Sequence, residues 1–148
     1  MKLSKSLPSY ILSISKNLFI VLFVYAAMSK FFDFHTFQVQ LGQSPIFTAF
    51  ADVVSWSIPL TELIIASLFL VPKYVPLAFY ASFSLMTMFT VYIILILNFS
   101  DFIPCSCGGV LENLSWTDHI IFNSAFIVIA ILGIYAYNAQ NQVKSETL

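Results

Sequence analysis

The sequence has few charged residues: Asp, Glu, Lys and Arg make up 9% of its 148 residues, and hydrophobic residues make up 59%. Soluble domains are nearer a quarter charged, so this composition excludes an ordinary soluble domain and indicates a protein of the lipid bilayer. Arginine is absent and the net charge is −1. Without a basic stripe, the chain is not expected to bind nucleic acid.

The sequence contains long runs of apolar residues with few charged residues between them. A hydrocarbon core about 30 Å thick needs a helix of about 20 mostly apolar residues. We expect such helices at about residues 17–34, 53–71, 77–97 and 117–137. Because a helix satisfies its own backbone amides, the sequence predicts an all-α membrane protein. Its single domain, residues 1–148, is expected to be a four-helix transmembrane bundle.

The residues before the first run allow two interpretations. Residues 1–16 form a polar leader in which Pro8 is expected to stop an early helix. A basic leader followed by a short apolar core is also typical of a cleaved signal peptide. We favour a membrane helix, because Phe31 and Phe34 continue the apolar character past Lys30.

Two long connections and one short turn join the four runs. The first connection, residues 33–52, contains turn signals and several aromatic residues, which predict a segment along the membrane surface rather than a free loop. A proline-rich turn follows the second run at Pro72. Ser115 and Asp118 have the spacing of a capping box, which predicts the start of the last helix.

The lysines predict the orientation in the membrane. If the N-terminus is cytoplasmic, all lysines except Lys30 lie on the cytoplasmic side, as the positive-inside rule favours. We therefore expect a multi-pass protein of the bacterial inner membrane with both termini in the cytoplasm. The connection at residues 98–116 would then face the periplasm, where disulfides can persist.

Cysteine is as scarce as charge, and both cysteines lie in the sequence Pro104-Cys105-Ser106-Cys107-Gly108-Gly109. Residues two apart reach Cα separations of roughly 5.5–7 Å, at the upper edge of disulfide reach. A bridge between them would be strained and easily reduced. It would close almost no loop, so a structural role is disfavoured. The pattern therefore favours a redox-active Cys105–Cys107 pair, although two reduced, inert cysteines in a turn are the alternative.

Three neighbours would tune these thiols. Gly108 and Gly109 can present consecutive backbone N–H groups that favour a thiolate. Glu112 opposes a thiolate by its negative charge, unless it serves as the proton acceptor.

A metal site is a competing interpretation of the cysteines. Two thiolates joined by His119 and His35, which the predicted topology puts on the same side, would suit zinc or copper. No familiar ligand spacing supports this set, so we do not favour a metal.

Glu62 is the other residue that points to function. It falls near the middle of the second run, where a charge costs at least about 2.5–3.5 kcal/mol to insert. An intramembrane carboxylate is therefore a candidate catalytic group. The alternative is a structural pair in which Lys30 binds Glu62 and holds two helices in register.

Several of these features together resemble a known family. They are Ala26-Ala27-Met28-Ser29-Lys30-Phe31, Pro59-Leu60-Thr61-Glu62-Leu63, and Cys105-Ser106-Cys107-Gly108-Gly109 followed by Leu114-Ser115-Trp116 and His119. Over nearly its whole length the chain resembles the DoxX-like superfamily, and more closely its MauE branch.

The resemblance implies a four-helix bundle similar to the vitamin K epoxide reductase and disulfide-generating quinone reductase bundles, with a redox-related role. MauE is implicated in maturing the disulfide-rich small subunit of methylamine dehydrogenase in the periplasm, and DoxX relatives are associated with quinone-linked sulfur oxidation. The quinone-linked enzymes place C-x-x-C near quinone and often use a second cysteine pair. This chain has one C-x-C and no other cysteine, which argues against independent disulfide synthesis.

Three functions remain open from the sequence. The first is thiol–disulfide exchange with a periplasmic thiol or disulfide protein through Cys105 and Cys107, with quinone as a candidate electron acceptor and Glu62 as a proton carrier. The second is a non-enzymatic membrane subunit that anchors or matures a periplasmic partner. The third is copper or zinc handling through the cysteines and His119. Whether the chain is an enzyme, and whether it forms homo- or hetero-oligomers in the bilayer, is left open.

Overall fold

The computed structural model describes residues 2–44, 46–99 and 115–146. Four long helices dominate this part of the chain: α1 (Lys2–Phe32), α3 (Ala51–Leu70), α4 (Val75–Phe99) and α5 (Trp116–Glu146). A shorter helix, α2 (Phe34–Gln43), and two 3₁₀ turns, η1 (Thr48–Phe50) and η2 (Pro72–Tyr74), connect them. The described residues contain no strand, and the predicted all-α class is confirmed.

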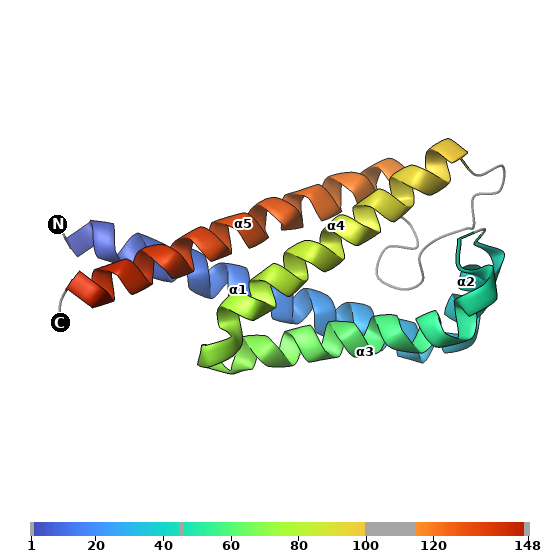
Figure 1. Cartoon of the computed structure of the whole chain (residues 1–148), viewed down its shortest axis with the longest axis horizontal. Coiled ribbons are helices and arrows are strands. Elements are labelled where there is room, and N and C mark those ends of the chain that lie inside the picture. Colours follow the sequence, from blue (N-terminus) through green and yellow to red (C-terminus); the bar gives the residue numbers. More distant parts are fainter. Residues whose placement is uncertain (1, 45, 100–114, 147–148) are drawn as a thin grey trace.

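Four segments are long and apolar enough to cross a membrane: Ser6–Phe32, Thr48–Leu70, Pro72–Phe99 and Trp116–Gln142. This confirms the predicted four-helix membrane architecture. Figure 1 shows an elongated bundle in which α3 and α4 form a hairpin at η2. The start of α1 and the end of α5 lie together at one end of the molecule, and α2 lies at the other.

The first helix is longer than the sequence indicated. Helix α1 begins at Lys2 and runs through Pro8, so the prediction that Pro8 stops an early helix is wrong. Proline removes one backbone donor and crowds the preceding turn, but membrane helices tolerate it where neighbouring groups compensate. Helix α5 also continues to Glu146, beyond the predicted end at residue 137. Each of these helices has 31 residues, about 46 Å at 1.5 Å per residue. Both project past the α3–α4 hairpin (Figure 1).

The first long connection is helical rather than a free loop. Helix α2 buries Phe37 and Leu41 and leaves His35 exposed, and the chain then returns through η1 into α3. The expectation of an ordered segment is therefore confirmed. Its position along a membrane surface stays a prediction.

Phenylalanines fill the core of the bundle near η2. The rings of Phe69 and Phe79 meet edge to face at 4.9 Å between centroids. Phe19 stacks on Phe69 at 5.8 Å and meets Phe126 at 5.3 Å. Gly133 of α5 lies directly against the Phe79 ring, where an added Cβ would overlap the ring carbons. A glycine is therefore required for α4 and α5 to pack this closely.

The last helix begins as predicted. The Ser115 hydroxyl accepts a hydrogen bond from the Asp118 N–H at 3.3 Å. The Asp118 carboxylate accepts one from the Ser115 N–H at 3.2 Å. These reciprocal bonds are a capping box, which fixes the position at which the chain enters α5.

Candidate functional site

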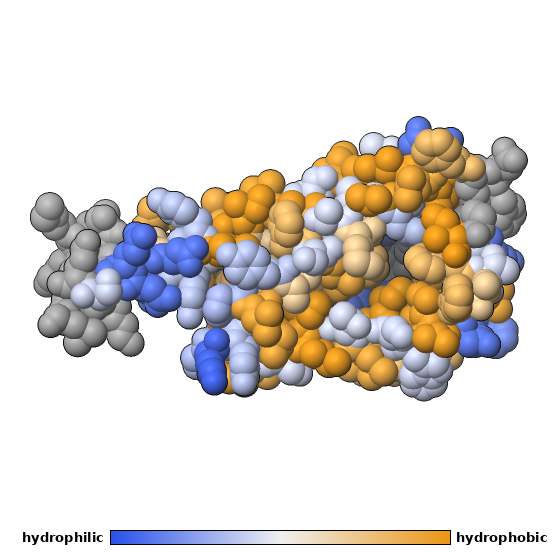
Figure 2. All heavy atoms as spheres, in the orientation of Figure 1, coloured by the Kyte–Doolittle hydropathy of each residue, from blue (hydrophilic) through white to orange (hydrophobic). Residues whose placement is uncertain are grey.

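A cavity of about 460 Å³ lies in the half of the bundle farther from η2. All five α-helices contribute to its walls. The walls are mostly apolar, with Phe23 from α1, Phe89 from α4 and Phe122 from α5 among them. Figure 2 shows the surface hollowed between α3 and α4 on the face in view. In size and apolar character the cavity is typical of a small-molecule site.

The mouth of this cavity opens sideways, between α3 and α4. Ser57 and Thr61 on α3 and Met88 on α4 line the cavity and are also exposed on the outside of the bundle. Thr61 lies near the middle of the Thr48–Leu70 span, and Met88 lies well inside the Pro72–Phe99 span. The mouth therefore lies within the membrane-spanning part of the helices rather than at their ends.

A buried ion pair forms part of the cavity wall. Lys30 Nζ of α1 lies 2.9 Å from Glu62 Oε1 and 3.2 Å from Glu62 Oε2 of α3. The same ammonium donates to the Ala26 carbonyl at 3.3 Å and lies 5.9 Å from the centre of the Phe37 ring. Lys30 is 8% exposed and Glu62 is 1% exposed. Lys30 thus turns inward to Glu62 instead of extending to an interface, and the pair joins the two helices.

Removing two charges from water is costly, and the mutual attraction in a low-dielectric site offsets this cost only when the geometry is good. Here both carboxylate oxygens accept from one ammonium, which also donates to a backbone carbonyl. The ion pair carries no net charge. The cavity is therefore polar at this wall but electrically neutral.

Asn123 of α5 is the unusual polar group of the cavity. Its side chain lines the cavity and the residue is only 7% exposed. The Asn123 side chain makes no hydrogen bond with any residue of the described ranges. In these ranges, every side-chain N or O atom that is fully buried has a hydrogen-bond partner. The Asn123 carboxamide therefore borders open space, and that space is the cavity. The Asn123 NH₂ group can therefore donate, and its side-chain carbonyl can accept, a hydrogen bond on an otherwise apolar wall.

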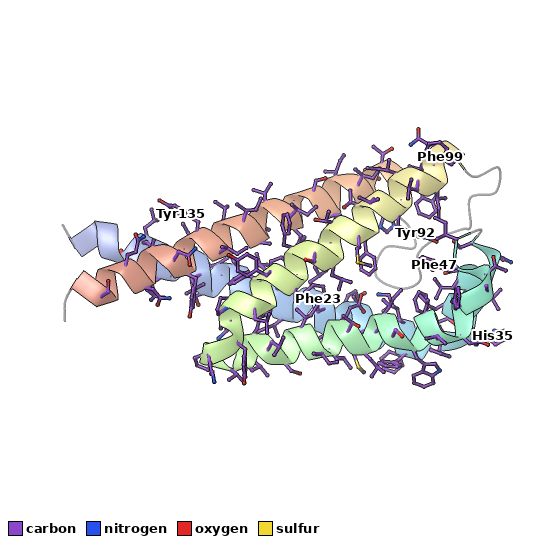
Figure 3. All side chains as sticks on the ribbon, in the orientation of Figure 1. Phe23, His35, Phe47, Tyr92, Phe99 and Tyr135 are labelled. Carbon is purple, nitrogen blue, oxygen red and sulfur yellow. The ribbon has the colours of Figure 1, made fainter. Side chains whose placement is uncertain are left out.

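A contact between α4 and the segment after α2 forms part of the cavity wall. Tyr92 donates a hydrogen bond to the Ser44 hydroxyl at 2.8 Å. The rings of Phe47 and Tyr92 lie 5.0 Å apart, and both side chains are labelled in Figure 3 beside α2 and α4. Ser44 is fully buried, so this contact fixes α4 against the α2 end of the bundle.

The residues predicted around the thiols, Cys105, Cys107, Gly108, Gly109 and Glu112, lie outside the described residues. Their roles stay predictions. The helices on either side of them are described, and both line the cavity, α4 through Tyr92 and Ile93 and α5 through Trp116 and His119. The segment that carries the cysteines therefore starts and finishes on cavity-lining helices.

The two histidines occupy different environments. His119 lines the cavity, and its ring lies 6.1 Å from that of Trp116. His35 is exposed on α2 and does not line the cavity (Figure 3). Within residues 2–44, 46–99 and 115–146, no three His, Cys, Asp or Glu side chains are grouped closely enough to hold a metal ion.

Sequence reasoning missed Asn123 and the cavity. A signal for Asn123 existed, because it is a lone carboxamide within the apolar run of residues 117–137. Polar side chains inside membrane spans usually face the bundle interior or a cavity. The cavity itself had no such signal, because it depends on how far α3 and α4 diverge from η2.

Comparison with known families agrees with this architecture. Residues 8–136 match the family described as methylamine utilisation protein MauE. The matched range runs from α1 into α5 and includes the cavity-lining residues and both cysteines. No curated protein and no solved structure matches the chain, and the broader likeness to DoxX and vitamin K epoxide reductase bundles stays a prediction. A match over most of the chain shows that this four-helix membrane protein belongs to the MauE family.

Proposed function

We propose that this protein exchanges thiols and disulfides with a periplasmic partner through Cys105 and Cys107. The observation that supports this most is the placement of the cavity. The cysteine segment joins α4 to α5, and both helices line a cavity. An ion pair, an imidazole and an amide without a partner among the described residues also line this cavity. Apolar sites with a few such polar groups are where membrane proteins carry out chemistry.

The exchange starts from a Cys105–Cys107 disulfide. A thiolate of the partner attacks one sulfur, the Cys105–Cys107 bond breaks, and a mixed disulfide forms while the other cysteine leaves as a thiolate. A second thiolate of the partner then attacks the mixed disulfide and releases the remaining cysteine. The partner gains a disulfide and loses two electrons, and the Cys105–Cys107 pair is left reduced. To act again, the pair must pass two electrons and two protons to an acceptor.

The surrounding residues have distinct roles in this proposal. Gly108 and Gly109 stabilise the leaving thiolate through their backbone N–H groups, and Glu112 accepts a thiol proton. Glu62 and His119 provide acid–base groups at the cavity, and Lys30 holds the Glu62 carboxylate in place. The positive-inside bias of the lysines supports a bacterial inner membrane with the termini in the cytoplasm.

The test uses the fact that the chain has only two cysteines. In the reverse of this exchange, the single thiolate left in Cys105→Ser or Cys107→Ser attacks the disulfide of an oxidised partner and releases a partner thiolate. The resulting mixed disulfide cannot be resolved from within the protein, because the second cysteine is missing. We expect at least one of the two variants to accumulate a covalent adduct in acid-quenched membranes, which dithiothreitol releases. The double serine variant is the matched blank and should show none.

A second measurement counts free thiols by alkylation in intact cells. The proposal requires a detectable oxidised fraction of wild-type protein. Absence of adducts from both single variants, together with fully reduced cysteines, would refute it. A stoichiometric complex that survives in the double variant would instead identify a non-enzymatic membrane subunit.

A further inference from the structure

We propose that the cavity binds the ring of a lipid-soluble quinone, and that the Asn123 carboxamide donates a hydrogen bond to a ring carbonyl. This inference rests on the proposed function and deepens it, because it names the class of electron acceptor for the cysteine pair. It depends on three properties of the described residues, which are the position of the mouth, the charge of the walls and the unpaired amide.

The position of the mouth selects a ligand that dissolves in the bilayer. Thr61 and Met88 border the cavity and are exposed on the outside of membrane-spanning segments. Met88 is 65% exposed, so the α4 side of the mouth faces the surroundings of the bundle. A molecule that enters here comes from the lipid phase, because water is excluded at this depth.

The charge of the walls selects a neutral ligand. Lys30 is the cation that lines the cavity, and Glu62 neutralises it at 2.9 Å. The ammonium donates to the Ala26 carbonyl as well as to the carboxylate. An anionic lipid head group would compete with Glu62 for these donors, and among the described residues no further cation lines the site to favour it. A neutral ring with carbonyl oxygens needs no such cation.

The unpaired amide supplies the specific contact. Asn123 is more than nine-tenths buried, lines the cavity and has no hydrogen-bond partner in the described ranges. An unpaired amide on an apolar wall is costly, and a carbonyl acceptor removes that cost. The aromatic rings of Phe23, Phe89 and Phe122 offer flat apolar surfaces for a ring beside it. Acyl chains of phospholipids fill apolar space but present no acceptor at their ends.

The chemistry of the ligand class matches what the cysteine pair must discharge. Oxidation of two thiols to one disulfide releases two electrons and two protons. Reduction of a quinone to a quinol takes up two electrons and two protons. The contribution of this chain is to hold the ring and to move protons. Asn123 orients the ring, and His119 and Glu62 line the same cavity as acid–base groups.

The experiment uses the two tryptophans. Trp116 lines the cavity, whereas Trp56 is exposed and packs against Phe31 and Phe34 outside it. In a Trp56→Phe background, Trp116 is the single reporter. The protein is placed in phosphatidylcholine nanodiscs and titrated with decylubiquinone or menadione. We expect saturable quenching of Trp116 emission with a dissociation constant in the micromolar range.

Matched variants give the inference its specificity. Asn123→Leu in this background should raise the dissociation constant at least about tenfold, the loss of roughly one hydrogen bond. Asn138→Leu makes the same change at an exposed position on the same helix and should leave it unchanged. Thr61→Phe narrows the mouth and should weaken quenching, whereas Leu60→Phe beside it, which does not line the cavity, should not.

Two results would overturn the inference. One is quenching that rises linearly with quinone in the lipid, without saturation. The other is equal affinity in Asn123→Leu and Asn138→Leu proteins that are both folded, as shown by a cooperative thermal unfolding transition. The cysteine double serine variant separates the two proposals, since it should bind quinone as the parent does. Quinone binding without any thiol adduct refutes the exchange function alone, and thiol adducts without quinone binding refute this inference alone.

Discussion

The two halves of the bundle differ in how their interiors are filled. The packed half, near η2, contains the phenylalanine core of Phe19, Phe69 and Phe79, with Gly133 pressed against it. The cavity half, near α2, contains a cavity of about 460 Å³, a buried ion pair and the Asn123 amide, which has no partner among the described residues. Membrane helices associate largely by close packing, so the packed half holds the bundle together. The cavity half keeps features that cost stability, and such features usually mark a functional site.

The largest effect should come from breaking the ion pair. Lys30→Met or Glu62→Leu alone leaves an uncompensated buried charge, which costs about 3–5 kcal/mol of unfolding free energy in comparable sites. The double variant Lys30→Met/Glu62→Leu should recover most of that loss, because no charge remains. Unfolding of the purified protein in mixed detergent micelles measures all three variants.

This double-mutant cycle also tests the comparison of the two halves. If the single losses simply add in the double variant, the two side chains do not interact and the observed pair has no energetic role. If the double variant is stable but inactive in thiol exchange, the pair serves function rather than register.

A smaller loss is expected in the packed half. Gly133→Ala places a Cβ into the Phe79 ring, which Phe19 and Phe69 hold from other sides. Overpacking of this kind costs about 1–3 kcal/mol. The matched control is Gly42→Ala in α2, where the nearest atom, the Ala51 Cβ, is 4.0 Å away.

The control should move in the opposite direction. Alanine favours a helix over glycine by about 0.5–1 kcal/mol, so Gly42→Ala should raise the thermal midpoint slightly while Gly133→Ala lowers it. Equal changes in the thermal midpoint at the two sites would mean that the packed half accommodates an added Cβ as well as the α2 end does.

The sequence predicted the four spans because each is a long apolar run, and lipid allows little else than a helix. It predicted the Ser115–Asp118 cap from two residues at fixed spacing. The prediction for Pro8 was wrong. The cost of one lost backbone hydrogen bond near the start of a helix is smaller than the stabilisation of the helix by the apolar residues on both sides of Pro8. Lys30 and Glu62 could be proposed as partners from opposite charges in neighbouring spans, but their inward geometry depends on how α1 and α3 pack. The cavity could not be predicted at all, because it arises from helix divergence rather than from any local pattern.

The smallest effect expected in the cavity half concerns Asn123 without ligand. Replacing it by leucine removes an amide that has no partner in the described ranges and adds apolar contact to the wall. Thermal unfolding of the quinone-free protein should therefore show Asn123→Leu to be more stable than wild type, by about 1 kcal/mol. Asn138→Leu, on the exposed face of α5, should change little.

The sign of this change separates a structural amide from one kept for a ligand. A structural amide has partners in the folded protein, and its removal destabilises. An amide kept for a ligand lowers stability until the ligand binds, and then raises it by mass action. Added quinone should consequently stabilise the wild-type protein and leave Asn123→Leu nearly unaffected. The difference between their thermal unfolding midpoints should therefore shrink or change sign. A leucine variant that unfolds earlier than wild type with and without quinone would place Asn123 among the structural residues of the bundle.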